Sequence, residues 1–474
     1  MKVGKKYRPS WNSLKTCAIP EWLDNAKFGI YTHWGVYSVP ACGPNGSWYP
    51  HNMYREGTEQ YEYHLKNYGH PSKFGYKDFI PMFRAERFDP EEWAELFKKA
   101  GAQFAGPVAE HHDGFSMWDS EINEWNAARM GPQRDVVGEL EKAIRRQGLK
   151  FMVAFHHAEN WWYYPHWRKE FDTSDPRYSG LYGPIHNRNA KPDIKWEDQD
   201  KPSKGFLEKW RGKIREVIDK YKPDLMWFDF MLGGVQERYR MEIFAYYYNK
   251  ALEWGRDVAV TYKGHDLPPG VGLVDLELGR MSELTYHNWI TDTSVDHSGA
   301  WSYINDARYK SVTMLVHNLV DNVSKNGYLL LNVGPKANGE IPEPAKERLL
   351  GIGEWLQVNG EAIYGTTPWV TYGEGPTKME IGGPFSERKE VQYTAEDIRF
   401  TVKDEALYAI CLGWPGEEAT VESLKKLYRS EISSVKMLGV DKELKWSLGG
   451  KGLQVKTPDE KPCKHAYVFK ILKT

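Results

Sequence analysis

The chain has 474 residues, of which 41% are hydrophobic and 14% aromatic, and its 63 basic and 65 acidic residues leave a net charge of −2. Because charges of both signs are spread along the chain, the sequence predicts neither a nucleic-acid partner nor a membrane-surface partner, and a small or neutral partner is expected. The length suits a barrel of alternating strands and helices followed by one smaller domain.

The N-terminal stretch and the cysteines place few limits on where the protein works. MKVGKKYRPSWNSLK has no apolar core of a signal peptide, and no later stretch approaches the length of a transmembrane helix. The four cysteines lack the spacing of a metal site and are too few for a disulfide framework. We expect a soluble chain, cytoplasmic as written or exported if a leader was removed, with its oligomeric state open.

Short apolar segments alternate with helical segments through the first three quarters of the chain. The segments predicted to be strands are residues 27–34, 103–112, 150–157, 224–230 and 257–264. Near-continuous apolar strands separated by helices are typical of a parallel sheet covered on both faces. No glycine-rich phosphate loop follows a strand, which favours an α/β fold of the (β/α)8 type, a TIM-type barrel, over an open sheet. We assign residues 1–365 to this barrel.

Two of the intervening helices have clear boundaries. One is expected to begin after Asp89, a good N-cap followed by Pro90, and to end before Gly101. The other carries an apolar stripe from Leu207 to Tyr221 and directly precedes the strand at 224–230. The sequence therefore predicts a unit of helix, turn and strand at this point.

The last hundred residues have a different pattern. Apolar residues alternate strictly with polar ones, as at Ile398, Phe400 and Val402, and glycine-rich turns separate the segments. This pattern is typical of an antiparallel β-sandwich, which we assign to residues 366–474. Histidines and carboxylates do not cluster there, so a packing or accessory role is expected.

Polar residues gather at the ends of the predicted strands. They are His33 after the first strand, His111 and His112 after the second, His156 and His157 after the third, Asp229 after the fourth and Lys263 after the fifth. In a barrel the carboxyl ends of the strands carry the active site, and the long segments 35–88 and 158–205 follow two of these ends. A single histidine at such a place is usually structural, but five polar strand ends together indicate a catalytic rim.

Two chemistries fit this rim. The first is a metal-dependent hydrolase with imidazole and carboxylate ligands. Its difficulty is that His111 and His112 are adjacent, as are His156 and His157, so the members of each pair point apart unless the strand has ended. The second is glycoside hydrolysis by two carboxyl groups.

For glycoside hydrolysis, Asp229 is the first carboxylate and Glu277 is the candidate for the second. Glu277 lies in VDLELGR between two leucines, where burial would raise its pKa toward that of a general acid. A surface acid paired with Arg280 is the alternative for Glu277, and Glu283 and Glu110 remain rivals. A catalytically silent sugar-binding protein is a further alternative.

Several long motifs resemble one enzyme family. They are FGIYTHWGVYSVP, AEHHDGFSMWDS, GLKFMVAFHHAENWW, PDLMWFDF, NGYLLLNVGPKANGEIP and IGEWLQVNGEAIYGT. Together they resemble the α-L-fucosidases of glycoside hydrolase family 29 over roughly residues 20–370. The resemblance implies an irregular (β/α) barrel followed by a β-sandwich, and retaining hydrolysis of terminal α-L-fucosyl residues from glycans without a metal or other cofactor.

The resemblance also implies roles for individual residues. Asp229 matches the family's nucleophile, and Trp48 matches a tryptophan that lines the fucose pocket. The histidines that match fucose-binding positions are His33, His111 and His112, and His156 or His157 is expected to add a contact. Glu277 matches a loop glutamate that serves as acid/base in one subgroup.

Two departures from the family pattern affect substrate choice. Ser47 stands where many members have a glutamate, and Lys263, counted here among the substrate-binding residues, stands near an arginine of many members. The ammonium group of a lysine is a point charge, whereas the guanidinium group of an arginine is planar and carries several donors. The two residues can therefore bind different hydroxyl groups of a sugar. A retaining glycosidase for L-galactose or a modified fucoside is therefore the alternative to an α-L-fucosidase.

Overall fold

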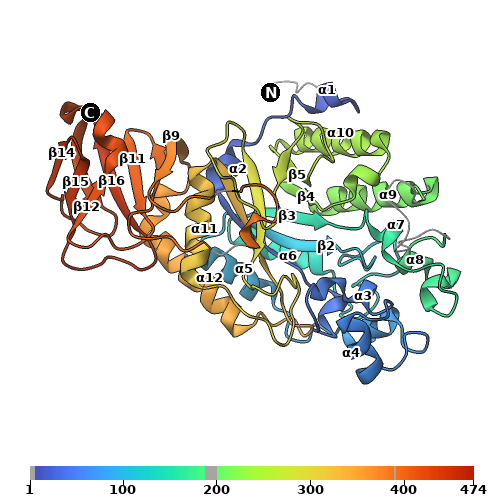
Figure 1. Ribbon diagram of the computed structural model, residues 1–474. Coiled ribbons are helices and arrows are strands. Elements are labelled where there is room, and N and C mark those ends of the chain that lie inside the picture. Colours follow the sequence, from blue (N-terminus) through green and yellow to red (C-terminus); the bar gives the residue numbers. More distant parts are fainter. Residues whose placement is uncertain (1–5, 187–199, 380, 389–390) are drawn as a thin grey trace.

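The computed structural model describes residues 6–186, 200–379, 381–388 and 391–474. Eight parallel strands close into a barrel, and a β-sandwich lies beside it (Figure 1). The barrel strands are β1 Phe28–Thr32, β2 Phe104–Glu110, β3 Lys150–Phe155, β4 Leu225–Phe228, β5 Ala259–Lys263, β6 Leu273–Asp275, β7 Trp289–Ser294 and β8 Gly327–Val333. The five strands expected from the sequence are therefore confirmed, each slightly shorter than predicted.

Within the described residues, six long helices cover the outside of the barrel. They are α5 Pro90–Lys99, α6 Val136–Arg146, α9 Lys204–Tyr221, α10 Glu237–Trp254, α11 Val312–Ser324 and α12 Glu343–Asn359. The shorter helices are α1 Trp11–Leu14, α2 Glu21–Ala26, α3 Tyr49–Asn52, α4 Glu59–Asn67, α7 Asn160–Tyr163 and α8 Ser179–Tyr182. The predicted cap of α5 is present, since the Asp89 side chain accepts hydrogen bonds from the backbone N–H groups of Glu91 and Glu92.

The barrel is irregular on one side. The connections from β5 to β6 and from β6 to β7, which are described throughout, contain no α-helix. In a regular barrel each strand is followed by a helix that packs against the sheet. The loop after β6, residues 276–288, therefore has no such helix to hold it.

Side chains alternate along the barrel strands between the interior and the helix layer. Those that fill the interior include Phe104 and Val108 of β2, Met152 and Ala154 of β3, and Leu225 and Trp227 of β4. Their neighbours on each strand, such as Phe151 and Phe228, belong to the outer core under the helices. Because the period is two, the next interior position after Ala154 is His156, and after Trp227 it is Asp229.

A bulge interrupts this alternation at the end of β2. The pairing of β2 with β3 shifts register between Val108 and Glu110, so β2 contains one extra residue there. A bulge changes the direction of the side chains that follow it. It turns Glu110 toward the helix layer and brings His111 to the interior position that Glu110 would otherwise occupy.

The C-terminal strands form two antiparallel sheets with a separate core. The strands are β9 Thr367–Glu374, β10 Ile398–Lys403, β11 Ala406–Cys411, β12 Glu418–Val421, β13 Ile432–Met437, β14 Trp446–Gly449, β15 Gly452–Lys456 and β16 Tyr467–Lys473. One sheet has the order β13-β16-β11-β10-β9 and the other β12-β15-β14. The predicted barrel with a C-terminal antiparallel sandwich is thus confirmed, and residues 1–365 and 366–474 stay our proposed domains.

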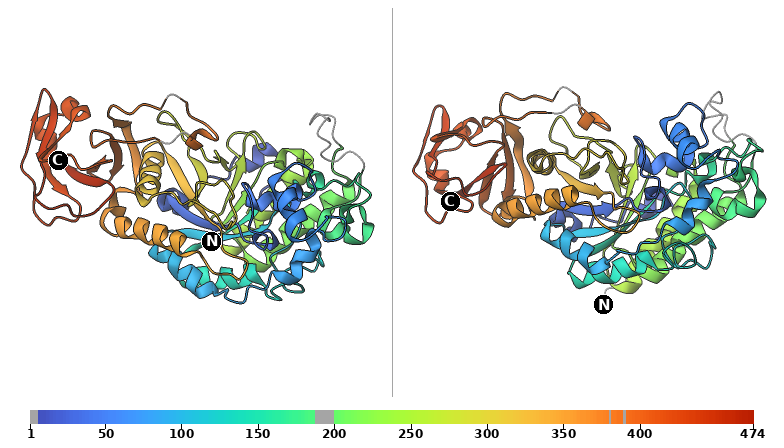
Figure 2. Two further views of the ribbon diagram at one scale, coloured as in Figure 1. Left: turned by 60° about the horizontal axis from the view of Figure 1, so that its bottom comes forward. Right: turned by 90° about the horizontal axis from the view of Figure 1, so that it is seen from below.

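Helices α11 and α12 lie between the barrel and the sandwich (Figures 1 and 2). A buried ion pair joins Arg399 of β10 to Asp321 of α11 at 2.6 Å. The indole N–H of Trp355 in α12 donates to the carbonyl of Ala466 at 2.9 Å. Since removing one member of a buried ion pair is costly, these contacts tie the sandwich firmly to the barrel. No described helix has the length and apolarity to cross a membrane.

Candidate active site

The polar ends of the barrel strands meet in a pocket of about 270 Å³. Of the residues predicted from the sequence, those that line it are His33, Trp48, His111, His112, His156, Asp229 and Glu277. They come from five strand ends and from the loop after β1. The histidines are at most 3% exposed, so the floor of the pocket is made of buried imidazoles.

Asp229 lies at the first interior position beyond β4 and is held by two imidazoles. Its Oδ2 lies 2.9 Å from Nδ1 of His156 and 3.4 Å from Nε2 of His112. Burial alone would raise the pKa of Asp229, but His156 and His112 outweigh this and hold the pKa well below its usual value. Asp229 is therefore an ionised carboxylate with one face toward the pocket.

Glu277 has the opposite electrostatic setting. Burial and the nearby charge of Asp229 raise its pKa, and this increase exceeds the lowering effect of Lys263, whose Nζ lies 3.2 Å from Glu277 Oε2. Its backbone N–H donates to Asp275 Oδ1 at 2.8 Å, which fixes the start of the loop after β6. The pocket thus contains one carboxyl group with a lowered pKa and one with a raised pKa, as the sequence interpretation required.

Lys263 lies beneath the pocket and supports it from below. Its ammonium group is fully covered and pairs with Asp275 at 3.1 Å and with Asp292, besides Glu277. Burial alone would lower the pKa of Lys263, but Asp275, Asp292 and Glu277 raise it well above its usual value. The structure therefore places Lys263 against the acid group rather than in the wall that a substrate would touch.

We expect Lys263→Met to destabilise the protein by roughly 3–5 kcal/mol, because it leaves three buried carboxyl groups without their shared cation. Urea unfolding at neutral pH measures this loss, with Lys263→Arg, which keeps the charge, as the matched control expected to lose less. Equal stability of the Met variant and the parent protein would contradict the buried cluster.

His33, His111 and His156 face one another across the pocket floor. Burial, followed by the charges of neighbouring histidines, lowers the pKa of His33 and His111, and burial is also the main cause of the lowered pKa of His156. Within the described residues, Nδ1 of His111 and Nε2 of His156 have no hydrogen-bond partner. Neutral rings with free nitrogen atoms are suited to hydroxyl groups of a sugar, and their spacing would also suit a metal ion.

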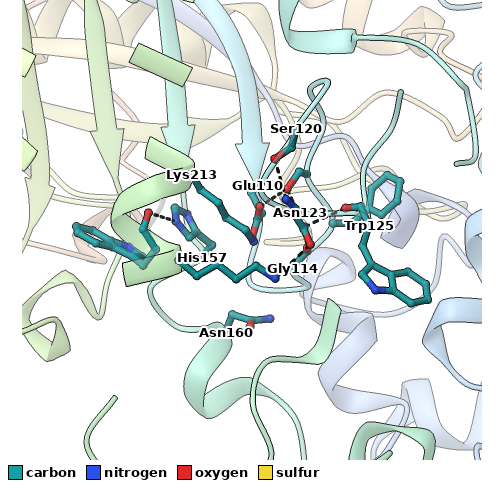
Figure 3. A network of polar contacts seen from close by, with 12 residues as sticks. Glu110, Gly114, Ser120, Asn123, Trp125, His157, Asn160 and Lys213 are labelled. Carbon is teal, nitrogen blue, oxygen red and sulfur yellow. Dashed lines mark hydrogen bonds and ion pairs between the residues drawn. The ribbon is translucent and has the colours of Figure 1, made fainter. Parts of the chain in front are cut away.

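The two adjacent histidine pairs behave differently. His111 and His112 both line the pocket, because β2 has ended at Glu110. His157 follows the outward alternation of β3 and lies outside the pocket, where its Nε2 faces the Trp210 carbonyl at 3.5 Å (Figure 3). The structure therefore does not bring His157 to the other predicted residues, and we remove it from the proposed set.

The rival carboxyl groups are also outside the pocket. Glu110 is buried in the helix layer, where it pairs with Lys213 of α9 and accepts from Ser116 (Figure 3). Glu283 is exposed in the loop after β6 and does not line the pocket. Among the three glutamates considered from the sequence, only Glu277 reaches the site of Asp229.

Sequence reasoning missed several pocket residues that the alternation of side chains could have identified. Tyr31 and Trp227 precede His33 and Asp229 by two residues, so they share the same face of their strands. Asp292 is the interior residue near the end of β7 and accepts from the Tyr31 hydroxyl at 2.7 Å. Trp301 lines the pocket from a loop, where the alternation of a strand gives no guide.

Glu159, also missed, is a further carboxyl group in the pocket wall, besides Asp229, Glu277 and Asp292. It lies 3.5 Å from Nδ1 of His112, the imidazole whose other nitrogen faces Asp229. Burial raises the pKa of Glu159 to about 7. Burial alone would lower the pKa of His112, but Glu159 and Asp229 raise it to about 9, so His112 is the charged imidazole of the site.

Comparisons with known proteins agree with this architecture along nearly the whole chain. The family model for alpha-L-fucosidase matches residues 1–361, and the model for the alpha-L-fucosidase C-terminal domain matches residues 391–472. Tissue alpha-L-fucosidase of Bos taurus is 33% identical over 97% of this chain and 88% of its own length. The human tissue enzyme is 31% identical over 97% and 89%.

Solved structures give the same result. The Thermotoga maritima alpha-fucosidase in complex with a mechanism based inhibitor has a TM-score of 0.78 and 31% identity, with 98% of this chain and 100% of that one covered. The structure of the same enzyme in complex with fucose has a TM-score of 0.77.

A closed barrel with two carboxyl groups of oppositely shifted pKa at the carboxyl ends of its strands has the features of a glycoside hydrolase, and the matched families place this protein in that class. Within the class, the chain belongs to the α-L-fucosidase family, glycoside hydrolase family 29. Its activity is the hydrolysis of α-L-fucosides.

Proposed function

We propose that this chain is a retaining, exo-acting α-L-fucosidase in which Asp229 is the nucleophile and Glu277 is the acid/base. The observation that carries the proposal is the opposite shift of two neighbouring pKa values, lowered at Asp229 and raised at Glu277. Double displacement requires one ionised and one protonated carboxyl group at the same time. We expect the two groups to lie roughly 5–5.5 Å apart when substrate is bound.

In the first step an Asp229 oxygen forms a bond to C1 of the fucosyl residue. The electron pair of the glycosidic bond moves to the leaving oxygen, which takes the proton of Glu277. In the second step Glu277 removes a proton from water, the water oxygen attacks C1, and the bond between C1 and Asp229 breaks. Both carboxyl groups then have their starting protonation states, and the sugar keeps its α configuration.

The size and lining of the pocket support a terminal fucosyl residue as the bound group. A cavity of about 270 Å³ with a buried floor has room for one sugar ring, which favours removal of terminal residues from oligosaccharide or polysaccharide glycans. We assign His33, His111, His112 and His156 to its hydroxyl groups. Trp48, whose ring lies edge-on to His112 at 5.3 Å, supplies an aromatic wall.

The side chain of Ser47 bears on which sugar the pocket binds. Its hydroxyl is buried in the same wall and has no partner among the described residues, in a place where many family members have a glutamate. A smaller, uncharged side chain there changes which hydroxyl groups of a sugar the wall can hold, and L-galactose, which has a hydroxyl on C6 that fucose lacks, is the sugar to compare. Rates on aryl α-L-fucoside and aryl α-L-galactoside compare the two, and we expect the fucoside to be preferred.

The stereochemistry of the first product tests the proposed function. Proton NMR during hydrolysis of an aryl α-L-fucoside should show α-L-fucose first, followed by slow conversion to the β form. Dialysis against a chelator should leave this rate unchanged, because no proposed step uses a metal. Initial formation of β-L-fucose, or loss of activity that zinc restores, would overturn the double displacement.

The pH dependence should follow the two carboxyl groups. Because the raised pKa of Glu277 keeps its proton, kcat/KM for an aryl fucoside should stay high until the pH rises through that pKa and then fall. At low pH activity should persist, because the pKa of Asp229 is depressed. Fucosyl fluoride needs no proton on its leaving group, so its kcat/KM should lack the alkaline decline.

Glu159→Gln is the control for this profile. Burial raises the pKa of Glu159 to about 7, so it also titrates in the relevant range. If Glu277 controls the alkaline decline, the decline remains in the Gln variant; its disappearance there would assign the titration to Glu159 instead.

A further inference from the structure

Three histidine rings on the pocket floor lie close enough together to share one ion. His33, His111 and His156 each offer one ring nitrogen atom, and these atoms lie within 4.8 Å of one another. The ring of His33 is steeply inclined to the other two, at 71° to His111 and 80° to His156. The three residues follow neighbouring strands of the barrel, β1, β2 and β3, and all are buried. The nitrogen atoms are therefore presented by rigid elements and shielded from bulk water.

The tautomer of His33 is fixed by the side-chain amide of Asn332. The amide nitrogen of Asn332 donates to the Ser294 hydroxyl at 3.0 Å and to the Trp301 carbonyl at 2.6 Å, so its Oδ1 is the acceptor end. Nδ1 of His33 lies 2.8 Å from this Oδ1 and must therefore carry the proton of the ring. Nε2 of His33 is then unprotonated, with its lone pair free to bind a ligand.

The tautomer of His156 is fixed in the same way by Asp229. Nδ1 of His156 lies 2.9 Å from the carboxylate, which can only accept, so Nδ1 carries the proton. Nε2 of His156 is then unprotonated, and it has no partner in the part of the chain that the structure describes. A histidine whose other nitrogen donates to a carboxylate or a carbonyl is the usual form of a metal ligand, because the second contact orients the ring.

The three rings suit zinc better than a hard cation. Neutral imidazoles are typical zinc ligands, whereas magnesium and calcium prefer oxygen. Tetrahedral zinc with Zn–N bonds of about 2.0–2.1 Å needs nitrogen atoms about 3.4 Å apart, so the rings must move closer by about 1 Å. His111 can supply most of this movement, because its Nδ1 has no hydrogen-bond partner among the described residues that would hold the ring.

A second group of possible ligands, His112, His156 and Asp229, has similar spacing but the wrong protonation. There an ion would have to displace the proton that His156 donates to Asp229. It would also have to displace a proton from His112, which lies between the carboxylates of Asp229 and Glu159. The two free nitrogen atoms of His33 and His156 need no such change, so the first group is the favoured one.

We propose that His33, His111 and His156 form a binding site for a zinc ion, and that this ion inhibits the enzyme by competing with the fucosyl residue. The competition rests on the proposed function, which assigns the same three rings to hydroxyl groups of fucose; the binding of the ion rests on the geometry alone. Zinc would also draw charge from Asp229 through His156, which weakens the nucleophile while the ion is bound.

Cobalt(II) is the probe for binding, because a cobalt ion in a tetrahedral nitrogen site has intense visible absorption bands. The metal-free protein titrated with cobalt chloride should show these bands in stoichiometric amount, and an excess of L-fucose should abolish them. In kinetics, zinc at about ten times its Kd should raise KM for an aryl α-L-fucoside about tenfold and leave kcat unchanged. A chelator should reverse this inhibition, and magnesium should not cause it.

His111→Asn removes one ligand and leaves the hydrogen bonds of His33 and His156 in place. Its cobalt bands should disappear, and its affinity for zinc should fall at least about 100-fold, since loss of a residue that only orients a ligand already costs about 10- to 100-fold. His70→Gln is the control, because His70 is exposed and does not line the pocket, and its bands and inhibition should equal those of the parent. Displacement of cobalt by fucose is measured on the parent protein, so it tests the site even if the Asn variant is unstable.

Three results would overturn the proposal: absence of the tetrahedral bands in the parent protein, zinc inhibition that persists in His111→Asn, and inhibition that lowers kcat without raising KM. Cobalt that is bound by the three histidines but not displaced by fucose would overturn the competition, because it would remove these rings from the fucose pocket. Failure of the proposed mechanism looks different, since β-L-fucose as the first product would refute double displacement whatever the cobalt spectrum shows.

Discussion

Asp229→Ala is expected to lower kcat/KM for an aryl α-L-fucoside by at least about 10⁴-fold, because the step that forms the covalent intermediate has no other nucleophile. The substitution should leave the fold intact. Asp229 lies just beyond the end of β4, beside the pocket. Without its carboxylate, the side chains of His156 and His112 can hydrogen-bond to each other and to water. Thermal unfolding of the variant checks this.

Azide distinguishes the loss of a nucleophile from a general loss of activity. In Asp229→Ala it can enter the vacated space and attack C1 from the face that the carboxylate used, which would give β-L-fucosyl azide. A 2-fluorofucosyl fluoride should label the parent protein, and the labelled peptide should contain Asp229. A label on any other residue, or full activity of the Ala variant, would refute the assignment.

Glu277→Ala is expected to lower kcat/KM for a fucosylated disaccharide by about 10²- to 10⁴-fold, the usual contribution of a general acid. The effect should depend on the leaving group, because fluoride leaves without a proton. With fucosyl fluoride, kcat/KM should stay within about threefold of the parent, while kcat falls as the intermediate accumulates without a base to activate water.

Here azide should give the opposite anomer. It attacks the intermediate on Asp229 from the other face, which yields α-L-fucosyl azide and restores turnover. Glu283→Ala is the matched control, since Glu283 lies in the same loop, is exposed and does not line the pocket. Comparable losses of kcat/KM in the two variants would mean that the activity depends on the conformation of the loop and not on the Glu277 carboxyl group.

The sequence predicted the barrel well because its signals are local. Apolar runs fix the strands, and Asp89 caps α5 where the pattern requires it. The number of strands was not predictable in this way, because β6 has only three residues. The absence of α-helices after β5 and β6 was not predictable either. Such a short strand forms because its neighbours on both sides already define the barrel, not because of its own composition.

The site was predictable only in part, for a geometrical reason. Residues at strand ends, such as His33 and Asp229, could be identified because parallel strands bring their ends together. The bulge near Ala109 could not be read from composition, although it decides that His111 and not Glu110 enters the pocket. Glu159 and Trp301 lie on long connections whose paths depend on the finished fold.

The two connections without helices have a consequence for how this enzyme can diversify. On that side of the barrel no helix covers the loop after β6, which is held by hydrogen bonds to β7 and to residues 381–388 and by the ion pair of Glu277 with Lys263, so insertions in its exposed part cost the core little. The opposite wall of the pocket is fixed by the pairing of the barrel strands, so insertions there would disturb the core. The enzyme can thus change which glycans it cleaves through sequence changes at one rim of the barrel, while its recognition of the cleaved sugar stays the same.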